Sequence, residues 1–137
     1  MACNCENCGG KITGLAHIGV RVSDMEASLR FYTEVLGFKL TGQQMMGTSH
    51  LAFLECGTCL IELIHPANYA PREAGQIDHI AMEVKGIDEL VCRLIEKGVH
   101  FLSDSVSTAP TLLDGVKNIF FTGPDGERFE FFEYYNR

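Results

Sequence analysis

Positive charge is scarce in this chain, because 11 lysines and arginines stand against 18 aspartates and glutamates, a formal net charge of -7. A nucleic-acid binder needs a basic face, so this balance argues against a DNA or RNA partner. No apolar run approaches the length of a membrane span, and the first residues contain no apolar signal core. We therefore expect a cytoplasmic protein without a membrane partner, whose six cysteines are mostly reduced thiols.

The composition is that of an ordinary globular protein, with 46% apolar and 21% charged residues in a chain of 137. This length fits one domain. We divide the chain into a cysteine-rich tail, residues 1–11, and a single domain, residues 12–137. Within the domain, two modules of about 12–67 and 76–136 have the same order of predicted elements.

The two modules are weakly similar in identity and clearly similar in order. The segment His17–Val22 aligns with His79–Val84, and each is followed by an amphipathic helix and then by a glycine, Gly37 or Gly98. Each helix is followed by three predicted strands, at about 38–46, 49–55 and 59–65 in the first module and 99–105, 117–122 and 128–135 in the second. The pattern predicts an α+β fold of two tandem βαβββ modules, which form a curled mixed sheet around a metal-containing cavity.

Two histidines and two glutamates recur at matching places, namely His17 and Glu62 in the first module and His79 and Glu130 in the second. Imidazole and carboxylate together suit nickel, cobalt or zinc, so we expect one divalent metal ion per site. Strand alternation puts His17 and Arg21 on one face of their strand. The alternative is that each residue is a satisfied polar group or a rim side chain.

The first helix is predicted to begin with a capping box, in which Ser23 and Glu26 satisfy the first free amides. The glycine and proline of residues 123–126 predict a turn before the last strand.

The thiols in the tail, Cys3, Cys5 and Cys8, resemble part of a zinc knuckle, to which a hairpin turn at 56–59 could add two thiolates. The alternative for the tail is a segment of reduced thiols without a metal.

These elements resemble the vicinal-oxygen-chelate superfamily, which contains glyoxalase I, bleomycin-resistance proteins, methylmalonyl-CoA epimerases and ring-cleaving dioxygenases. The resemblance covers about residues 14–135. It is carried by residues 28–37 (Ser-Leu-Arg-Phe-Tyr-Thr-Glu-Val-Leu-Gly) and 123–130 (Gly-Pro-Asp-Gly-Glu-Arg-Phe-Glu). Similarity to the short bacterial glyoxalase I implies the metal ligands His17, Glu62, His79 and Glu130.

The resemblance also implies substrate contacts and an activity. Arg21 resembles the arginine that binds the glutathione carboxylate, and we expect Phe53 and Phe120 to contact substrate as well. The implied reaction is a lyase reaction on a 2-oxoaldehyde–thiol hemithioacetal through an enediolate, with Glu130 and Glu62 as the catalytic proton carriers. Pro66 departs from this pattern, because glyoxalases of this type have an asparagine there, and the segment ending at Pro66 resembles methylmalonyl-CoA epimerase instead.

Two other functions therefore remain open. One is a metal-dependent epimerase of a 2-acyl thioester, or another isomerase or dioxygenase of the superfamily. The other is a non-catalytic protein that binds a small molecule and confers resistance. In each case the partner is a small-molecule substrate or ligand. We also expect a homodimer, because paired modules leave apolar edges and faces to cover. The loops at 68–75 and 103–115 are expected to frame the mouth of the cavity.

Overall fold

The structure is a computed structural model that describes residues 17–71 and 79–136. The tail of residues 1–11 lies outside the described residues, as does the proposed zinc knuckle within it. The first module contains β1 (Ile18–Arg21), α1 (Met25–Arg30), a π-helical turn η1 (Phe31–Val35), β2 (Lys39–Met46), β3 (Ser49–Cys56) and β4 (Cys59–His65). The second contains β5 (Ile80–Glu83), α2 (Ile87–Glu96), β6 (Ser107–Ala109), a 3-10 turn η2 (Leu112–Asp114), β7 (Val116–Thr122) and β8 (Arg128–Tyr134).

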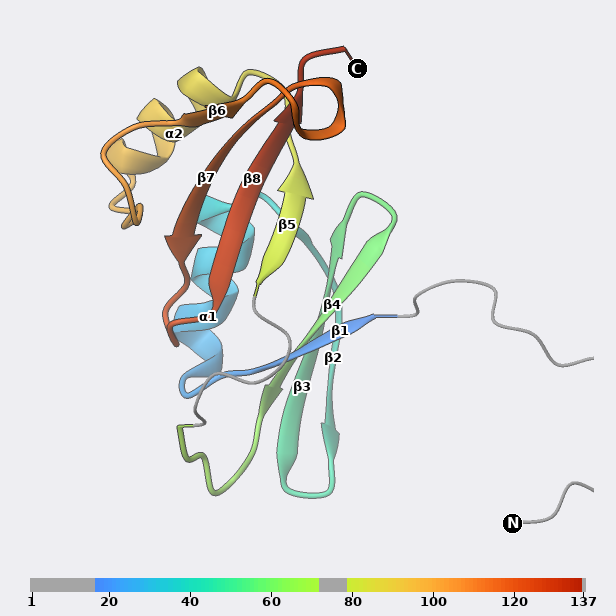
Figure 1. Ribbon diagram of the computed structural model, residues 1–137. Coiled ribbons are helices and arrows are strands. Elements are labelled where there is room, and N and C mark those ends of the chain that lie inside the picture. The colour runs from blue at the N-terminus through green and yellow to red at the C-terminus, as the bar shows by residue number, and fades with distance from the viewer. Residues whose placement is uncertain (1–16, 72–78, 137) are drawn as a thin grey trace, which may run out of the picture.

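The strands form two four-stranded sheets of the same topology (Figure 1). The first sheet has the order β1-β4-β3-β2 and the second has the order β5-β8-β7-β6. In each, the first strand of the module pairs parallel with the last, and the other neighbours are antiparallel. The prediction of two βαβββ modules is confirmed, and the two sheets remain separate.

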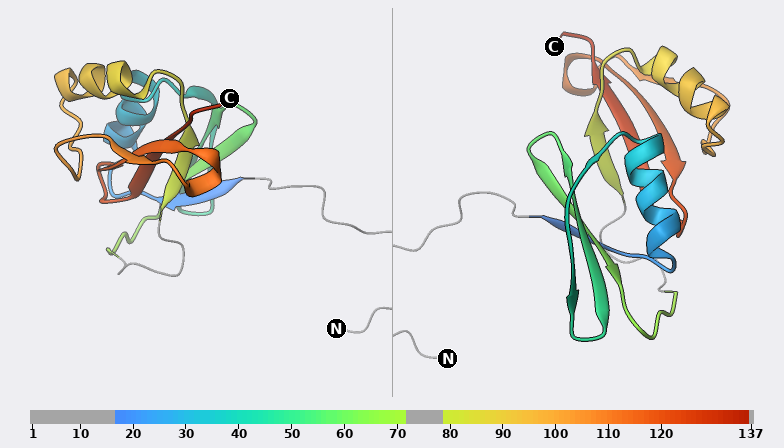
Figure 2. Two further views of the ribbon diagram at one scale, coloured as in Figure 1. Left: turned by 45° about the horizontal axis from the view of Figure 1, so that its top comes forward. Right: turned by 180° about the vertical axis from the view of Figure 1, so that it is seen from behind.

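One apolar core joins the modules, and strand alternation explains its membership. Val22 is fully buried, and Ile18 and Val20 pack against the same core, as their spacing on one face predicts. The two views in Figures 1 and 2 show α1 against one face of the second sheet. There Tyr32 packs edge-on against Phe129, with ring centroids 5.8 Å apart, so the first module's helix covers the second module's last strand.

The cap of α1 differs from the prediction. The capping box from Ser23 to Glu26 is wrong, because Asp24 is the N-cap and its carboxylate accepts from the Ala27 amide at 3.0 Å. Asp and Ser are similarly favourable caps, so either residue could have begun the helix. The predicted end of the helix is confirmed, since Gly37 follows it with φ of 78°, a left-handed conformation that glycine adopts readily.

The strand predicted at 99–105 is wrong. That segment makes only an isolated bridge between Phe101 and Phe121, and β6 lies later in the chain. Its apolar residues face the core without forming a ladder, since Val99 and Phe101 are partly buried against it. Because alternate residues pack against the core, this mostly irregular segment has the sequence pattern of a strand.

The second helix, α2, buries Ile87, Val91 and Leu94 along one face. Cys92 lies on the same helix and is exposed. In the parts of the chain that the structure describes, no helix has the length and apolar character needed to cross a membrane.

Candidate functional site

The four predicted metal ligands form two close pairs. His17 Nε2 lies 2.9 Å from Glu62 Oε2, and His79 Nε2 lies 3.2 Å from Glu130 Oε2. We call the first pair the first half-site and the second pair the second half-site. Within residues 17–71 and 79–136, no three His, Cys, Asp or Glu side chains gather in one group that could hold a metal ion. A single site with all four ligands therefore stays a prediction.

The register of the strands places the two half-sites at equivalent positions. Glu62 lies opposite Gly19 on β1 and Phe53 on β3. Glu130 lies opposite Ala81 on β5 and Phe120 on β7. Each carboxylate thus has a small residue on one side and a phenylalanine on the other.

The small neighbours leave room beside the carboxylates. Gly19 has only Glu62 Oε2 and one methyl group of Ile64 close to the position that a Cβ would occupy, at 3.9 and 3.4 Å. Gly19 and Ala81 are both exposed, so the face that carries the half-sites is open on the first strand of each sheet. This openness allows a ligand to approach the carboxylates from the side of β1 or β5.

The second half-site has further support from β7. Asn118 Nδ2 donates to Glu130 Oε1 at 2.7 Å. The Phe120 ring packs edge-on against the His79 ring, with centroids 5.2 Å apart, and the Arg128 guanidinium lies 4.4 Å above the same phenylalanine. Sequence reasoning missed Asn118 and Arg128 as site residues. Alternation could have found them, because both lie an even number of residues from a predicted site residue on the same strand.

A cavity of about 260 Å³ opens at the second half-site. It is lined by Ala81, Glu83, Glu130, Phe132 and Tyr134. Phe53 and Phe120, which were predicted to contact substrate, belong to the first and second half-sites, respectively.

Arg21 lies at the end of β1, the strand that directly follows His17, and its guanidinium is 6.0 Å from the Tyr69 ring centroid. Its Nε is buried and has no hydrogen-bond partner in the part of the chain that the structure describes. A buried donor without an acceptor is costly, so this position favours an anionic or carbonyl ligand. Tyr69 belongs to the loop at 68–75, which the sequence placed at the mouth of the cavity.

The donor chemistry fits a divalent metal ion. Each half-site offers one imidazole nitrogen and one carboxylate oxygen, the ligand types of nickel, cobalt and zinc. In each pair the two donor atoms are about 3 Å apart, a separation that two ligands of one ion can adopt, because metal–ligand bonds are about 2.0–2.2 Å long. Each pair would supply half of a four-ligand site.

The fold and the paired side chains define a class of proteins with two βαβββ modules and one histidine–glutamate pair per module. The model of the Glyoxalase/Bleomycin resistance protein/Dioxygenase superfamily matches residues 14–131. The chain belongs to this superfamily, as the sequence motifs predicted.

Known relatives differ in their functions. The chain is 34% identical to the YwbC protein of Bacillus subtilis over 122 residues, which are 85% of this chain and 94% of that protein. It is 32% identical to the mitochondrial methylmalonyl-CoA epimerase of Bos taurus, over 66% of this chain and 57% of that protein. Among solved structures, the trypanothione-dependent glyoxalase I of Leishmania major is 25% identical with a TM-score of 0.70, covering 85% of this chain and 84% of that chain.

Proposed function

We propose that the protein is a metal-dependent lyase of the glyoxalase I type, which isomerises a 2-oxoaldehyde–thiol hemithioacetal. The observation that carries this proposal is the pair of matched half-sites, each with a histidine nitrogen about 3 Å from a glutamate oxygen. Its ligands would be His17, Glu62, His79 and Glu130, with one nickel, cobalt or zinc ion. Two carboxylates flanking one substrate suit a reaction that moves a proton between neighbouring carbons.

The bound metal would act as a Lewis acid that stabilises the negative charge of an enediolate. Glu62 or Glu130 takes the proton from one carbon of the substrate, and a carboxylate returns it to the adjacent carbon. Arg21, whose Nε has no partner, binds an anionic or carbonyl group of the substrate. Phe53 and Phe120 flank the carboxylates and exclude water from the proton transfer.

A second candidate, an epimerase of a 2-acyl thioester, uses the same proton transfer. Two observations favour it. Pro66 stands where the glyoxalases that the chain resembles have asparagine, and mammalian methylmalonyl-CoA epimerases match at 30–32% identity. The chain spans less than two thirds of the length of those epimerases.

Solvent-deuterium exchange distinguishes the two candidates. Mixtures of methylglyoxal with different thiols, and separately 2-methyl-branched acyl thioesters, are incubated with the metal-loaded protein in heavy water. A lyase converts the hemithioacetal into the hydroxyacyl thioester, whereas an epimerase exchanges the proton at the branched carbon and inverts its configuration. If neither substrate reacts while metal is bound, both reactions are excluded and the non-catalytic binding function is favoured.

We further propose that two copies complete each metal site, so that the first half-site of one copy joins the second half-site of the other. The half-sites lie on separate sheets, and no third described His, Cys, Asp or Glu joins either pair. The hairpin of β2 and β3 projects away from the second sheet in both views, and β2 exposes Leu40, Met45 and Met46 (Figures 1 and 2). These apolar side chains are available for a homodimer contact.

Metal content tests the site and its sharing. Wild type is expected to hold about one ion per chain, and His79→Ala is expected to lose it. The sharing is tested by mixing His17→Ala and His79→Ala chains after separate purification and reassembly. If the site is shared, a mixed dimer regains one intact set of four ligands and binds metal again. If each site lies within one chain, no intact set forms and the mixture remains without metal.

The proposed location is the cytoplasm. Cys56, Cys59 and Cys92 are free thiols in the structure, which suits a reducing compartment. Fractionation of cells that express the native chain, followed by immunoblotting, tests this location.

A further inference from the structure

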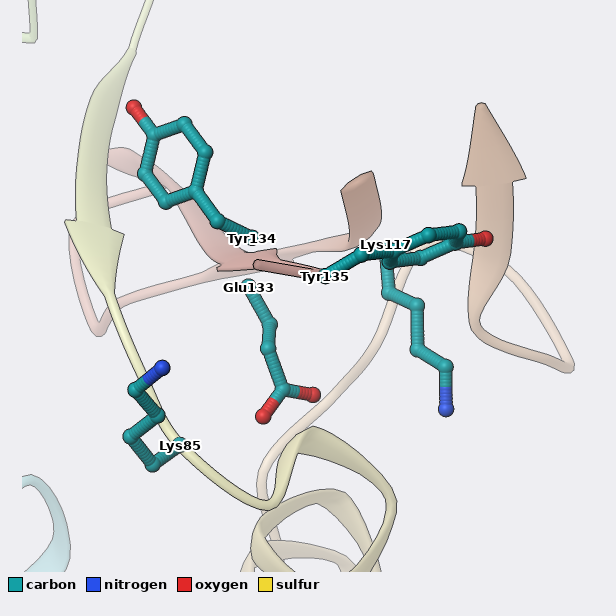
Figure 3. A pocket seen from close by; sticks show the side chains of 5 residues that line it. All are labelled: Lys85, Lys117, Glu133, Tyr134 and Tyr135. Carbon is teal, nitrogen blue, oxygen red and sulfur yellow. The ribbon is translucent and has the colours of Figure 1, made fainter. Parts of the chain in front are cut away.

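A second cavity, of about 440 Å³, lies at the end of β8 and next to the start of α2. It is lined by Lys85, Lys117, Glu133, Tyr134 and Tyr135 (Figure 3). None of these residues belongs to a half-site, and the proposed reaction assigns no role to them. Two ammonium groups and two aromatic rings around one hollow make this the most distinctive polar site outside the half-sites.

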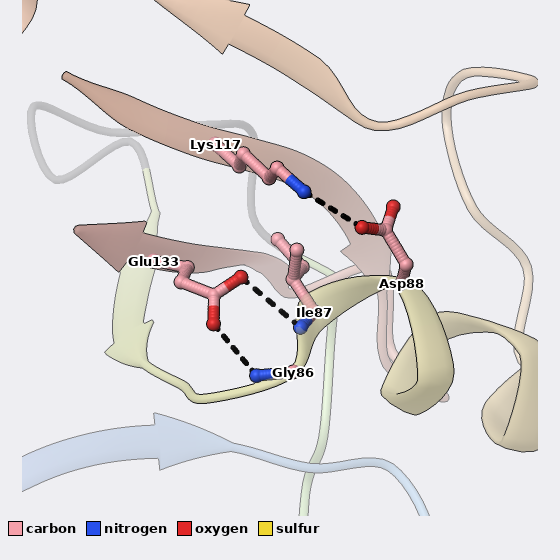
Figure 4. A network of polar contacts seen from close by, with 5 residues as sticks. All are labelled: Gly86, Ile87, Asp88, Lys117 and Glu133. Carbon is pink, nitrogen blue, oxygen red and sulfur yellow. Dashed lines mark hydrogen bonds and ion pairs between the residues drawn. The ribbon is translucent and has the colours of Figure 1, made fainter. Parts of the chain in front are cut away.

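The charges of the cavity do not all remain available to a ligand. Both oxygens of Glu133 accept backbone amides at the start of α2, from Gly86 at 2.6 Å and from Ile87 at 3.2 Å (Figure 4). The positive end of the helix dipole therefore offsets this carboxylate. The Lys117 ammonium pairs with Asp88 at 2.8 Å.

Lys85 is different, because its ammonium has no hydrogen-bond or ion-pair partner among the described residues. In Figure 3 its side chain lies to the left of Glu133 and below Tyr134. Glu133 is held by the amides of α2 and Lys117 is paired with Asp88, so Lys85 is the charged lining group whose ammonium has no partner among the described residues, and it lies next to two phenol rings. This combination suits a single anionic group carried on an organic chain.

Tyr134 connects this cavity to the candidate active site. It lines both the 440 Å³ cavity and the 260 Å³ cavity that contains Glu130. Glu130 and Tyr134 lie on the same strand with side chains on the same face, since they are an even number of residues apart. A ligand whose reacting end lies at Glu130 can therefore extend along β8, pass Tyr134 and reach Lys85.

We propose that Lys85 binds an anionic group, a carboxylate or a phosphate, at the end of the substrate distant from the reacting carbons. Lys85 is then a specificity-determining residue, and Tyr134 is the wall along which the substrate chain lies. The inference rests on the proposed function, because it places the reacting end of the substrate at the second half-site. It implies that acidic thiol conjugates are preferred over neutral ones.

The test uses binding rather than turnover. The metal-loaded protein is titrated calorimetrically with hydroxamates, which chelate metals, that carry an alkyl chain of increasing length ending in a carboxylate. Each acid is compared with its uncharged carboxamide, and one acid is also compared with the corresponding phosphate ester. The same titrations are repeated on Lys85→Met and on the matched control Lys97→Met, whose ammonium donates to the Glu34 carbonyl at 3.0 Å, outside the cavity.

At one chain length the acid is expected to bind about tenfold more tightly than its carboxamide, which corresponds to one charge-assisted contact. This preference should disappear in Lys85→Met, remain in Lys97→Met and weaken as salt is raised. Equal binding of acids and carboxamides at every length, or a preference that survives in Lys85→Met, overturns the inference while the metal site stands. Absence of binding by every hydroxamate overturns the proposed metal site and this inference with it. Preference for the phosphate ester over the carboxylate identifies phosphate as the group bound.

Discussion

The two half-sites have the same ligands and different surroundings. In the second half-site, Asn118 donates to one oxygen of Glu130, and the Glu130 side chain is 8% exposed. In the first, the register puts Leu51 at the position equivalent to Asn118, and the Glu62 side chain is 14% exposed. Glu130 is therefore more firmly fixed than Glu62.

This difference assigns distinct roles to two chemically identical residues. A carboxylate that is buried and held by an amide keeps its orientation, as a metal ligand needs. A carboxylate held only by its histidine can leave the metal and return at lower cost, as a proton carrier needs. We therefore expect Glu130 to contribute more to metal affinity and Glu62 to contribute more to proton transfer.

The largest expected effect comes from replacing each glutamate by glutamine. Both Glu62→Gln and Glu130→Gln should lower turnover of the proposed substrate by about 10²- to 10⁴-fold, since a proton carrier is lost. Metal affinity, measured by competition with a chelator, should fall more in Glu130→Gln. Equal metal affinities in the two variants, or near-normal turnover in Glu62→Gln, would contradict the division of roles.

The next effect concerns the amide that distinguishes the half-sites. Asn118→Leu gives the second half-site the residue type of the first, and it removes a hydrogen bond to a buried carboxylate. The free energy of unfolding should fall by about 1.5–3 kcal/mol, measured by urea denaturation of the metal-free protein. In a Glu130→Gln background the same substitution should cost less, because the charged acceptor is absent. Equal costs in both backgrounds would mean that Asn118 stabilises the strand rather than Glu130.

The helices allow a similar comparison, because α1 is capped by its own Asp24 and α2 by Glu133 from β8. The Glu133 carboxylate thus serves as a remote cap, since it lies 46 and 47 residues from the amides that it accepts. Asp24→Ala and Glu133→Ala should each lower the free energy of unfolding by about 0.5–2 kcal/mol. Amide hydrogen exchange should accelerate at the start of α1 in the first variant and at the start of α2 in the second. Acceleration of α2 in Asp24→Ala would show that the caps are not independent.

The smallest effect concerns a polar contact between the two modules, in which the Tyr32 hydroxyl donates to Glu127 at 3.1 Å. Burial raises the pKa of the Glu127 carboxyl above its ordinary value. Between the ordinary and the raised pKa, the native state binds more protons than the unfolded state, so this group's contribution to stability is lost as pH rises through that interval. Glu127→Gln removes the ionisable carboxyl, so residue 127 no longer makes stability depend on pH in this interval.

As pH rises above about 4.5, the ordinary pKa of the carboxyl, Glu127→Gln should therefore gain stability relative to wild type, so that its free energy of unfolding increases compared with that of wild type. Urea denaturation of both proteins across the acidic range measures this difference. Tyr32→Phe serves as a control for the hydrogen bond, because it keeps the carboxyl. A difference that shrinks as pH rises would show that the raised pKa is wrong.

Much of the fold followed from local patterns. Alternation identified Ile18 and Val20 as core residues, and the three strands after α1 lie within about one residue of their predicted bounds. The same reasoning failed at 99–105, because burial of Val99 and Phe101 imitates a strand whether or not a ladder forms. It also missed the remote cap at α2, since no local pattern connects Glu133 with Gly86.

The sequence by itself determined the two modules and the strand face on which each matched histidine and glutamate lies, because these depend on spacing within single strands. Only the tertiary structure decided which groups support each glutamate, such as Asn118 beside Glu130, and that Lys117 has an ion-pair partner whereas Lys85 has none among the described residues. Those contacts join strands and helices that are distant in sequence. They depend on the register of the sheets and on helix packing, which no single segment encodes.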